Sequence, residues 1–276
     1  MAIDLFSIGR FTVHGYGLMI GLGFIAAVLA GCYLAKRRGL SDSDFTNIAM
    51  LVLVFGFAGG KLLHIIVEFR SFISDPMSVL GSEGFAVYGG ILSGILTIYL
   101  YCRIKKLEFI KYIDLFAAAV PLNQALGRIG CLLAGCCYGK ETDSAFSIVF
   151  PEGAMAPAGV KLIPTQPLMA FGNFIIFLVI TLTYLASCPK KTEDDKDDAD
   201  KKKPAKIYVP GSATAQYLIM YSVGRFVIEY FRNDYRGEVG PFSTSQFIAI
   251  FTFIAGIVVL VRSRKVRLSD ERSDIR

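Results

Sequence analysis

The stretch Ile113–Gly139 reads IDLFAAAVPLNQALGRIGCLLAGCCYG and places a single arginine, Arg128, among Ala, Leu, Ile, Gly and Cys. An apolar helix of about 20 residues spans the roughly 30 Å of hydrocarbon in a bilayer. A guanidinium group cannot lose its charge, and its burial in hydrocarbon costs about 3 kcal/mol or more. Because such residues usually face a partner or a water-filled cavity, Arg128 is a candidate functional residue.

Apolar runs of similar length recur along the chain and predict an all-α polytopic membrane protein with seven transmembrane helices. The chain has 276 residues, of which 54% are hydrophobic, a larger share than a soluble domain usually carries. A soluble all-α protein with a large core is the alternative, but it would not confine its charges to the segments between the runs. The predicted helices are Val13–Ala35, Phe45–Val67, Phe85–Tyr101, Ile113–Ala134, Leu168–Cys188, Tyr208–Phe231 and Phe247–Val261. The third and seventh are short and are expected to continue into flanking polar residues.

The distribution of Lys and Arg predicts the orientation of these helices, because cytoplasmic segments of membrane proteins are enriched in basic residues. The segments after the first, third, fifth and seventh predicted helices carry most of the basic residues, beginning with Lys36-Arg37-Arg38. The N-terminus is therefore expected outside and the C-terminus in the cytoplasm. The net charge of +6 is expected to reflect membrane topology and not nucleic-acid binding.

One membrane-embedded domain, residues 1–276, is expected, with three polar segments outside the bilayer. Residues 138–166, with three prolines, are expected to form the longest outside loop. Residues 189–206 (PKKTEDDKDDADKKKPAK) are a mixed-charge, low-complexity run that cannot bury apolar area. They are expected to be a disordered cytoplasmic linker between the fifth and sixth helices. Residues 262–276 are expected to be a basic cytoplasmic tail.

The predicted orientation brings the unusual residues to one depth. Arg128 and a second intramembrane arginine, Arg225, both fall in the outward halves of their helices. Five polar or aromatic residues fall near the outer ends of the first three helices: His14, Tyr16, Lys61, His64 and Tyr88. A site is therefore expected in the outer leaflet, close to the lipid headgroups. His64 taken alone is typical of a hydrogen-bonded interior histidine.

Arg225 has a candidate partner on its own helix. Tyr221, Arg225 and Glu229 are spaced four residues apart and share one helix face. Glu229 can pair with Arg225 and lower the free-energy cost of its burial. An ion pair that only locks helices together is the structural alternative to a functional role.

Arg128 has no carboxylate within four residues on either side, so its partner must come from another helix or from a ligand. An anionic ligand at headgroup depth is most simply a phospholipid phosphate. The planar guanidinium group suits bidentate binding of phosphate. We therefore expect direct phosphate contact from Arg128 and a partly structural role for Arg225.

Cysteine and glycine residues surround Arg128 without matching a cofactor motif. Cys131, Cys136 and Cys137 have the spacing C-x4-C-C, which matches no zinc signature. They are expected to pack as small apolar groups, and redox chemistry at the vicinal pair is the alternative. Glycines such as Gly89 and Gly139 favour close helix packing or the approach of the backbone to a ligand. No metal and no cofactor is expected.

Five sequence elements follow one another on the predicted outer side. They are His14-Gly15-Tyr16-Gly17-Leu18-Met19, Tyr88-Gly89-Gly90, Gly127-Arg128-Ile129-Gly130 through Tyr138-Gly139, Pro164-Thr165-Gln166, and Tyr221-x3-Arg225-Phe226-x2-Glu229. In this order they resemble the phosphatidylglycerol–prolipoprotein diacylglyceryl transferase family, and the similarity covers nearly the whole chain. The short GRxG element alone is weakly specific, whereas the ordered set is specific.

The resemblance implies a multi-pass enzyme of the bacterial inner (cytoplasmic) membrane. Members of this family move the diacylglyceryl group of phosphatidylglycerol to the lipobox cysteine thiol of a preprolipoprotein signal peptide, and glycerol-1-phosphate leaves. The expected catalytic residues are Arg128, Arg225, Tyr16 and Tyr88, and the expected substrate-binding residues are Arg128, Tyr221, Glu229, Gly139 and His14. The implied partners are phosphatidylglycerol, the preprolipoprotein and membrane lipids, without nucleic acid.

Four positions depart from the family pattern. Tyr88 stands where a histidine, often assigned as the base, precedes the Gly-Gly pair. Cys131 stands where asparagine is frequent, Cys136 where a polar or acidic residue is common, and Met169 close to a frequent glutamate. A tyrosine with a pKa of about 10 is a poor base at neutral pH. Two alternatives therefore stay open: a paralogue that transfers a lipid moiety to another acceptor, and a non-catalytic phospholipid binder or transporter.

Overall fold

The computed structural model describes residues 4–8, 11–82, 84–188, 208–233 and 237–273. Its long helices are α1 (Gly15–Arg37), α2 (Asp42–Val67), α5 (Val87–Lys105), α6 (Phe109–Ala134), α7 (Thr165–Ala186), α8 (Ser212–Glu229) and α9 (Thr244–Ser273). Two short helices, α3 (Phe69–Ser74) and α4 (Pro76–Gly81), follow α2. The strands form two-stranded antiparallel sheets: β1 (Asp4–Ile8) with β2 (Phe11–His14), β3 (Ile148–Val149) with β4 (Lys161–Leu162), and β5 (Glu238–Val239) with β6 (Phe242–Ser243).

Among the described residues, six helices are long and apolar enough to cross a membrane: α1, α2, α5, α6, α7 and α9. This confirms the prediction of an all-helical membrane protein in its coarse form. The sixth predicted helix corresponds to α8, whose 18 residues include Gln216, Ser222, Arg225 and Glu229. These polar side chains lower the hydropathy of α8. The third and seventh predicted helices continue into polar residues, as expected, and end at Lys105 and Ser273.

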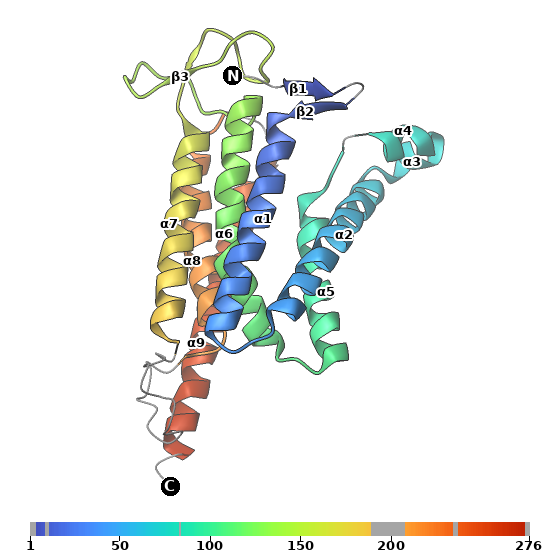
Figure 1. Ribbon diagram of the computed structural model, residues 1–276. Coiled ribbons are helices and arrows are strands. Elements are labelled where there is room, and N and C mark those ends of the chain that lie inside the picture. Colours follow the sequence, from blue (N-terminus) through green and yellow to red (C-terminus); the bar gives the residue numbers. More distant parts are fainter. Residues whose placement is uncertain (1–3, 9–10, 83, 189–207, 234–236, 274–276) are drawn as a thin grey trace.

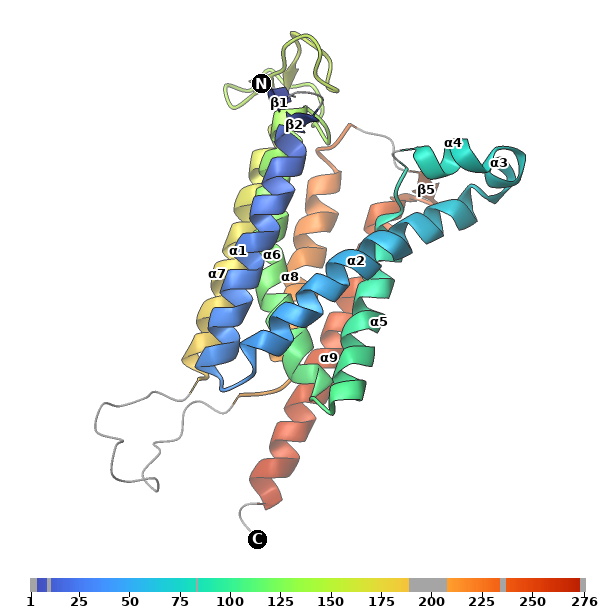
Figure 2. The same cartoon turned by 45° about the vertical axis from the view of Figure 1, so that its right-hand side comes forward.

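The helices form a bundle and an inclined pair. Figure 1 shows α1, α6, α7 and α8 side by side, and α9 packs against α8. Helices α2 and α5 pack on each other and lean away from the bundle, which the turned view in Figure 2 also shows. The β1–β2 sheet and the 135–164 connection lie at one end of the bundle, called the hairpin end below, and the end of α9 lies at the other. Helices α6 and α8 both run toward the hairpin end.

Glycines allow helix backbones to come into direct contact, as membrane helices require. A Cβ atom at Gly130 of α6 would lie 3.2 Å from the carbonyl oxygen of Tyr16 in α1. A Cβ atom at Gly89 of α5 would overlap the carbonyl group of Gly59 in α2. A side chain at Gly89 would therefore push α5 away from α2, and one at Gly130 would crowd the contact between α6 and α1, which carry Arg128 and Tyr16.

A buried carboxylate fixes the start of α8 against α6, at the end of the bundle opposite the hairpin end. Asp114 of α6 is fully buried. Its Oδ1 accepts hydrogen bonds from the amide and the hydroxyl group of Thr214, at 2.9 and 2.6 Å. Its Oδ2 accepts hydrogen bonds from the hydroxyl group of Tyr208 and the amide of Gly211, at 2.5 and 2.7 Å. Four donors on one carboxylate set the register of α8 along α6.

Arg38 extends this anchor to α1 and α7. Its guanidinium group lies over the rings of Tyr184 and Tyr208, with 4.2 and 3.7 Å to the ring centroids. It also donates a hydrogen bond to the carbonyl group of Tyr184 at 3.0 Å. The predicted linker 189–206 lies outside the described residues, and Arg38 joins the two segments that flank it.

The β1–β2 sheet and the short helices α3 and α4 were not predicted from the sequence. Lys61 of α2 donates hydrogen bonds to the carbonyl groups of Val79 and Ser82, at 2.9 and 2.8 Å. Nε2 of His64 lies 3.4 Å from the hydroxyl oxygen of Ser82. Both α2 side chains thus hold the segment around α4, which gives them a structural role.

Replacement of Asp114 by alanine should lower the free energy of unfolding by about 3 kcal/mol or more, because several buried donors lose their acceptor. Thermal unfolding of the detergent-solubilised protein measures this loss. Asp143→Ala removes an exposed carboxylate from the 135–164 connection and should change stability by less than about 0.5 kcal/mol. Equal unfolding temperatures for the two variants would contradict the anchoring role of Asp114.

Candidate active site

The Arg225–Glu229 ion pair lies near the hairpin end of α8. Nη1 of Arg225 lies 2.5 Å from Oε2 of Glu229, and only 10% and 8% of the two side chains are exposed. Nη2 of Arg225 donates a hydrogen bond to the hydroxyl oxygen of Ser245 in α9 at 2.7 Å. The pairing expected from the four-residue spacing is therefore present. Ser245 adds a partner that the sequence did not indicate.

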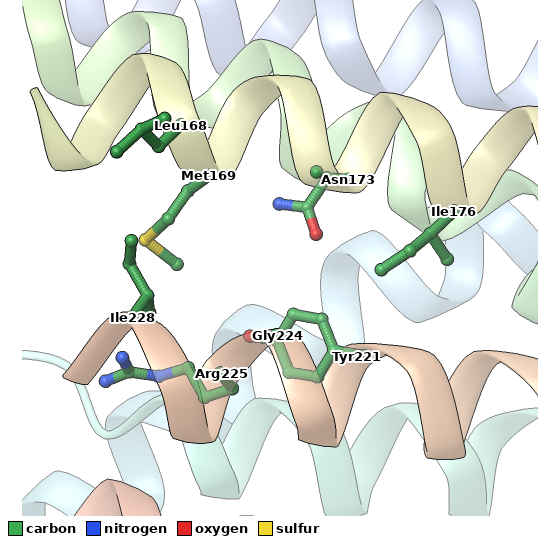
Figure 3. A pocket seen from close by; sticks show the side chains of 9 residues that line it. Leu168, Met169, Asn173, Ile176, Tyr221, Gly224, Arg225 and Ile228 are labelled. Carbon is green, nitrogen blue, oxygen red and sulfur yellow. The ribbon is translucent and has the colours of Figure 1, made fainter. Parts of the chain in front are cut away.

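A cavity of about 80 Å³ separates α7 from α8 beside Arg225. Its lining residues are Leu168, Met169, Gly172, Asn173 and Ile176 of α7, and Tyr221, Gly224, Arg225 and Ile228 of α8. Figure 3 shows Asn173 and the ring of Tyr221 facing each other across it, with the guanidinium group of Arg225 at its edge. A water needs about 10–15 Å³ of such space, so the cavity can hold a few waters or a small polar group, but not a diacylglyceryl chain.

Arg128 lies at the level of Tyr221 along the bundle. Nε2 of Gln124 in α6 donates a hydrogen bond to the hydroxyl group of Tyr217 in α8 at 2.8 Å. Arg128 and Tyr221 each follow this pair by about one helical turn, on helices that run in the same direction. The rings of Tyr217 and Tyr221 stack with 5.5 Å between centroids. Arg128, Tyr221 and Arg225 therefore occupy adjacent layers of the bundle.

The surroundings of Arg128 differ from those of Arg225. Nη1 of Arg128 lies 3.9 Å from Sγ of Cys131, one turn further along α6. Among the described residues, no Asp or Glu forms an ion pair with Arg128. Tyr16 lies on the facing helix α1, is 44% exposed, and is within electrostatic reach of Arg128. The predicted contrast between the two arginines therefore holds within this part of the chain.

The end of α6 folds three cysteines together. Gly135, at φ 72°, ends the helix in a Schellman motif, in which the amides of Gly135 and Cys136 donate to the carbonyl groups of Leu132 and Cys131, at 3.3 and 3.1 Å. This motif brings the side chains of its first and last residues, here Cys131 and Cys136, into contact. Cys137 then adopts a left-handed conformation at φ 61°. All three Sγ atoms lie within 4.8 Å of one another.

The start of α7 holds this cysteine turn in place. Oγ1 of Thr165 donates a hydrogen bond to the carbonyl group of Cys137 at 2.9 Å, and Nε2 of Gln166 donates one to the carbonyl group of Cys136 at 2.8 Å. Both donors are buried. The Pro164-Thr165-Gln166 element, singled out by resemblance alone, thus positions the backbone at the end of α6.

Gly139 and Arg232 join the 135–164 connection to the end of α8. The two residues form an antiparallel β-bridge, and a Cβ atom at Gly139 would lie 2.5 Å from the carbonyl oxygen of Ile163. Arg232 is 5% exposed, and its Nη1 lies 3.9 Å from Sδ of Met169. Sequence reasoning gave Arg232 no role, and its position just after Glu229 was the only signal for it.

The pKa values of the vicinal thiols Cys136 and Cys137 are shifted by the other thiols of the cluster and, for Cys137, also by nearby arginines. The pKa of the Cys137 thiol lies below its usual value, because hydrogen bonds with the thiols of Cys131 and Cys136, and then the positive charges of Arg232 and Arg128, stabilise the thiolate. The pKa of the Cys136 thiol is raised by the same two neighbouring thiols and by burial.

His14 and Tyr88 lie at the margin of this group. His14 is exposed at the N-cap of α1, two residues before Tyr16. Tyr88 is exposed in the first turn of α5. Helix α5 meets α6 at the opposite end of the bundle, where the ring centroids of Tyr99 and Phe109 are 5.7 Å apart. Toward the hairpin end, α5 leans away from α6 (Figure 1). Tyr88, in the first turn of α5, therefore lies on a helix that is separated at this level from α6, which carries Arg128.

Breaking the Arg225–Glu229 pair should destabilise the protein more than removing both charges. Glu229→Leu leaves a buried guanidinium group without its carboxylate and should cost about 3–5 kcal/mol. The double variant Arg225→Met with Glu229→Leu should be more stable than Glu229→Leu alone, because neither charge remains. Thermal unfolding of both single variants and the double variant measures the coupling, and additive losses would contradict it.

Comparison with known proteins identifies close relatives along the whole chain. Residues 4–262 match the protein family described as "Prolipoprotein diacylglyceryl transferase". The chain is 38% identical over 257 residues to the phosphatidylglycerol–prolipoprotein diacylglyceryl transferase of Clostridium tetani, which covers 92% of this chain and 95% of that protein. It is 40% identical over 261 residues to phosphatidylglycerol–prolipoprotein diacylglyceryl transferase 2 of Clostridium perfringens, which covers 94% of each. A third relative, from Finegoldia magna, has the same name as the first and is 30% identical over 270 residues, 97% of this chain and 98% of that protein.

Proposed function

We propose that this chain, which belongs to the prolipoprotein diacylglyceryl transferase family, transfers the diacylglyceryl group of phosphatidylglycerol to a prolipoprotein. The acceptor is the thiol of the lipobox cysteine in the signal peptide of the preprolipoprotein. The products are a thioether and glycerol-1-phosphate. The observation that supports this site most strongly is that Arg128 has a permanent charge near the hairpin end, and among the described residues no carboxylate pairs with it.

The reaction is a displacement at a glyceryl carbon. The cysteine sulfur forms a bond to that carbon, the bond from the carbon to the phosphate-ester oxygen breaks, and the electron pair leaves with glycerol-1-phosphate. Negative charge therefore builds on the phosphate in the transition state. A guanidinium group fixed in a water-poor site stabilises this charge without having to reorganise. The thiol must also lose its proton.

Arg128 is the residue that we assign to the phosphate. Its nearest described partner is the Cys131 thiol, a weak acceptor that a phosphate oxygen would displace. The charge of Arg225 is engaged by Glu229 and Ser245, so we assign to it the positioning of α8 and a positive field beside the reacting groups. Tyr16, on the facing helix, supplies a hydroxyl donor at the same depth.

The other predicted site residues take supporting roles in this proposal. Tyr221 lines the cavity at the level of Arg128 and contacts the substrate, and Glu229 holds Arg225. Gly139 lets the 135–164 connection lie close to the end of α8. His14, at the N-cap of α1, stands at the hairpin end, where a lipid headgroup would enter, and Tyr88 lies in the first turn of α5.

The proposed setting is the inner membrane of a bacterium, with the hairpin end outside and α8 crossing the membrane together with the six apolar helices. Helix α8 packs against α6, α7 and α9, so its polar face can contact protein and not lipid. Lys36 and Arg37 end α1 at the opposite end of the bundle, which agrees with a cytoplasmic location for that end. Exposed apolar side chains such as Leu29, Phe57 and Leu92 would contact membrane lipids.

A second candidate function is transfer of a lipid moiety to another acceptor. Tyr88, Cys131 and Cys136 depart from the pattern that the resemblance implies and favour a change in chemistry. Expression of the chain in cells that lack their own transferase separates the two candidates. Restored lipoprotein maturation supports the first, and correct membrane insertion without maturation supports the second.

Arg128→Ala should lower transfer from labelled phosphatidylglycerol to a lipobox peptide by about 10²–10³-fold, because the charge on the leaving phosphate loses its donor. Arg128→Lys should restore only part of the rate, since an ammonium group keeps the charge but not the planar fork. Arg103→Ala, at an exposed position near the other end of α5, is the matched control and should keep full activity. A folded Arg128→Ala variant with full activity would sink the assignment.

The proposed orientation predicts which introduced cysteines a membrane-impermeant maleimide reaches in intact cells. Ser144→Cys places a thiol in the exposed 135–164 connection, and Ser43→Cys places one at an exposed position near the start of α2, at the opposite end. Labelling above that of the unmodified chain is expected for Ser144→Cys and not for Ser43→Cys until the cells are opened. The reverse result would invert the topology.

A further inference from the structure

The three-cysteine cluster at the end of α6 is a chemical feature that the proposed reaction has not used. The Sγ atoms of Cys131, Cys136 and Cys137 lie within 4.8 Å of one another. Cys131 is buried, whereas Cys136 and Cys137 are half-buried, so the cluster can be reached from one side. It lies directly beside the residue assigned to the phosphate, since Nη1 of Arg128 is 3.9 Å from Sγ of Cys131.

The arrangement is fixed by backbone geometry and not by chance contact of flexible side chains. The Schellman motif at Gly135 sets Cys131 against Cys136, and the left-handed conformation at Cys137 turns the third thiol toward the other two. The hydrogen bonds from Thr165 and Gln166 hold the carbonyl groups of the two vicinal cysteines. All three thiols therefore come from the end of α6 and the turn after it, and α7 holds the backbone of that turn, so the geometry of the cluster is fixed, as a metal site requires.

The distances suit a tetrahedral zinc ion. Sulfur atoms that are each about 2.3 Å from a tetrahedral zinc lie about 3.8 Å from one another. A contraction of the cluster by at most about 1 Å therefore brings three thiolates into the first coordination shell. Structural zinc sites have four protein ligands, whereas catalytic sites have three and leave one position open. This cluster has three.

The charges around the cluster also suit zinc. Three thiolates and one Zn²⁺ together carry one net negative charge, which is unfavourable in apolar surroundings. Arg128 and Arg232 both act electrostatically on Cys137, so two positive charges are within reach to offset it. Arg232 is 5% exposed, and water screens its charge little.

We propose that Cys131, Cys136 and Cys137 form a zinc site with one open position, and that the acceptor cysteine of the substrate binds there as a thiolate. The second part rests on the proposed function. Zinc deprotonates a coordinating thiol outright, and the proton passes to solvent. The sulfur then bonds to the glyceryl carbon as the bond from that carbon to the phosphate oxygen breaks. The thioether product carries no charge and is a weaker ligand, so it leaves.

The proposal accounts for a difficulty in the sequence. Tyr88 stands where the resemblance described above implies a histidine, and a tyrosine is a poor base at neutral pH. The end of α5 that carries Tyr88 also leans away from α6. A thiol that binds zinc needs no nearby base, because coordination to the metal stabilises the thiolate and the proton passes to solvent.

Metal binding is tested on the full chain in detergent, with reduced thiols and without substrate. One zinc per chain is expected by mass spectrometry of the metal, and Co²⁺ in its place should give a thiolate-to-cobalt absorption band. Cys131→Ser, Cys136→Ser and Cys137→Ser should each weaken zinc binding by more than about 100-fold. Cys32→Ser is the matched control, because Cys32 lies on α1, away from the cluster, and its thiol contacts the hydroxyl group of Thr46 and a nearby carbonyl group, at 3.2 and 3.8 Å.

Substrate activation is tested on the same protein. A lipobox peptide should strengthen the cobalt band by adding a fourth thiolate, and a peptide with serine in place of the cysteine should not. Removal of zinc by a chelator should lower transfer by at least about 10-fold, and added zinc should restore it.

Each outcome bears on one part of the proposal. Reduced protein that binds no zinc, binds only copper(I), or keeps zinc in all three serine variants overturns the site. A disulfide within the cluster in protein isolated from cells also overturns it. Zinc binding with chelator-insensitive transfer overturns the activation step. Zinc binding without any transfer supports the site and counts against the proposed function, so the two failures are distinguishable.

Discussion

The structure depends on one constraint, which is that a guanidinium charge inside a helical bundle of membrane length must be compensated within the protein. Arg225 meets this constraint with Glu229 on its own helix and Ser245 on α9. These polar groups make α8 poor at facing lipid, and neighbouring helices α6, α7 and α9 pack against it. The position of α8 in the bundle, and hence the cavity that it shares with α7, follows from the need to enclose this charge.

The same constraint has a different solution at Arg128. The helix-face rule that pairs residues four apart finds no carboxylate near it, and within the described residues its closest acceptor is a thiol. A charge compensated this weakly is available to an anionic ligand, whereas one held by a buried carboxylate is not. This difference in local partners, and not any difference in depth, separates an arginine that can bind phosphate from one that organises a helix.

The sequence predicted the features that depend on short-range periodicity. Hydrophobic runs placed the long helices, the four-residue spacing predicted the Arg225–Glu229 pair, and charge patterning ordered the polar residues by depth. The sequence alone did not predict contacts between residues that are distant in the chain. The four hydrogen bonds to Asp114 join residues almost 100 positions apart, and the role of Arg232 depends on a β-bridge to Gly139. The sheet β1–β2 was missed because the strong apolar signal of the run after it dominated its short segment, and helices α3 and α4 because they lie between two such runs.

The cysteines show how much one neighbouring glycine changes the geometry that a short motif predicts. A C-x4-C-C spacing fits no zinc signature when zinc is expected in loops with two intervening residues. The glycine before the vicinal pair changes the geometry, because a Schellman motif closes the helix and places residues five apart in contact. With Gly135 included, the spacing already predicts that Cys131 and Cys136 touch. The turn that ends α6 therefore determines both where the helix stops and which side chains stand next to Arg128, so the backbone of this one turn links the fold to the chemistry of the site.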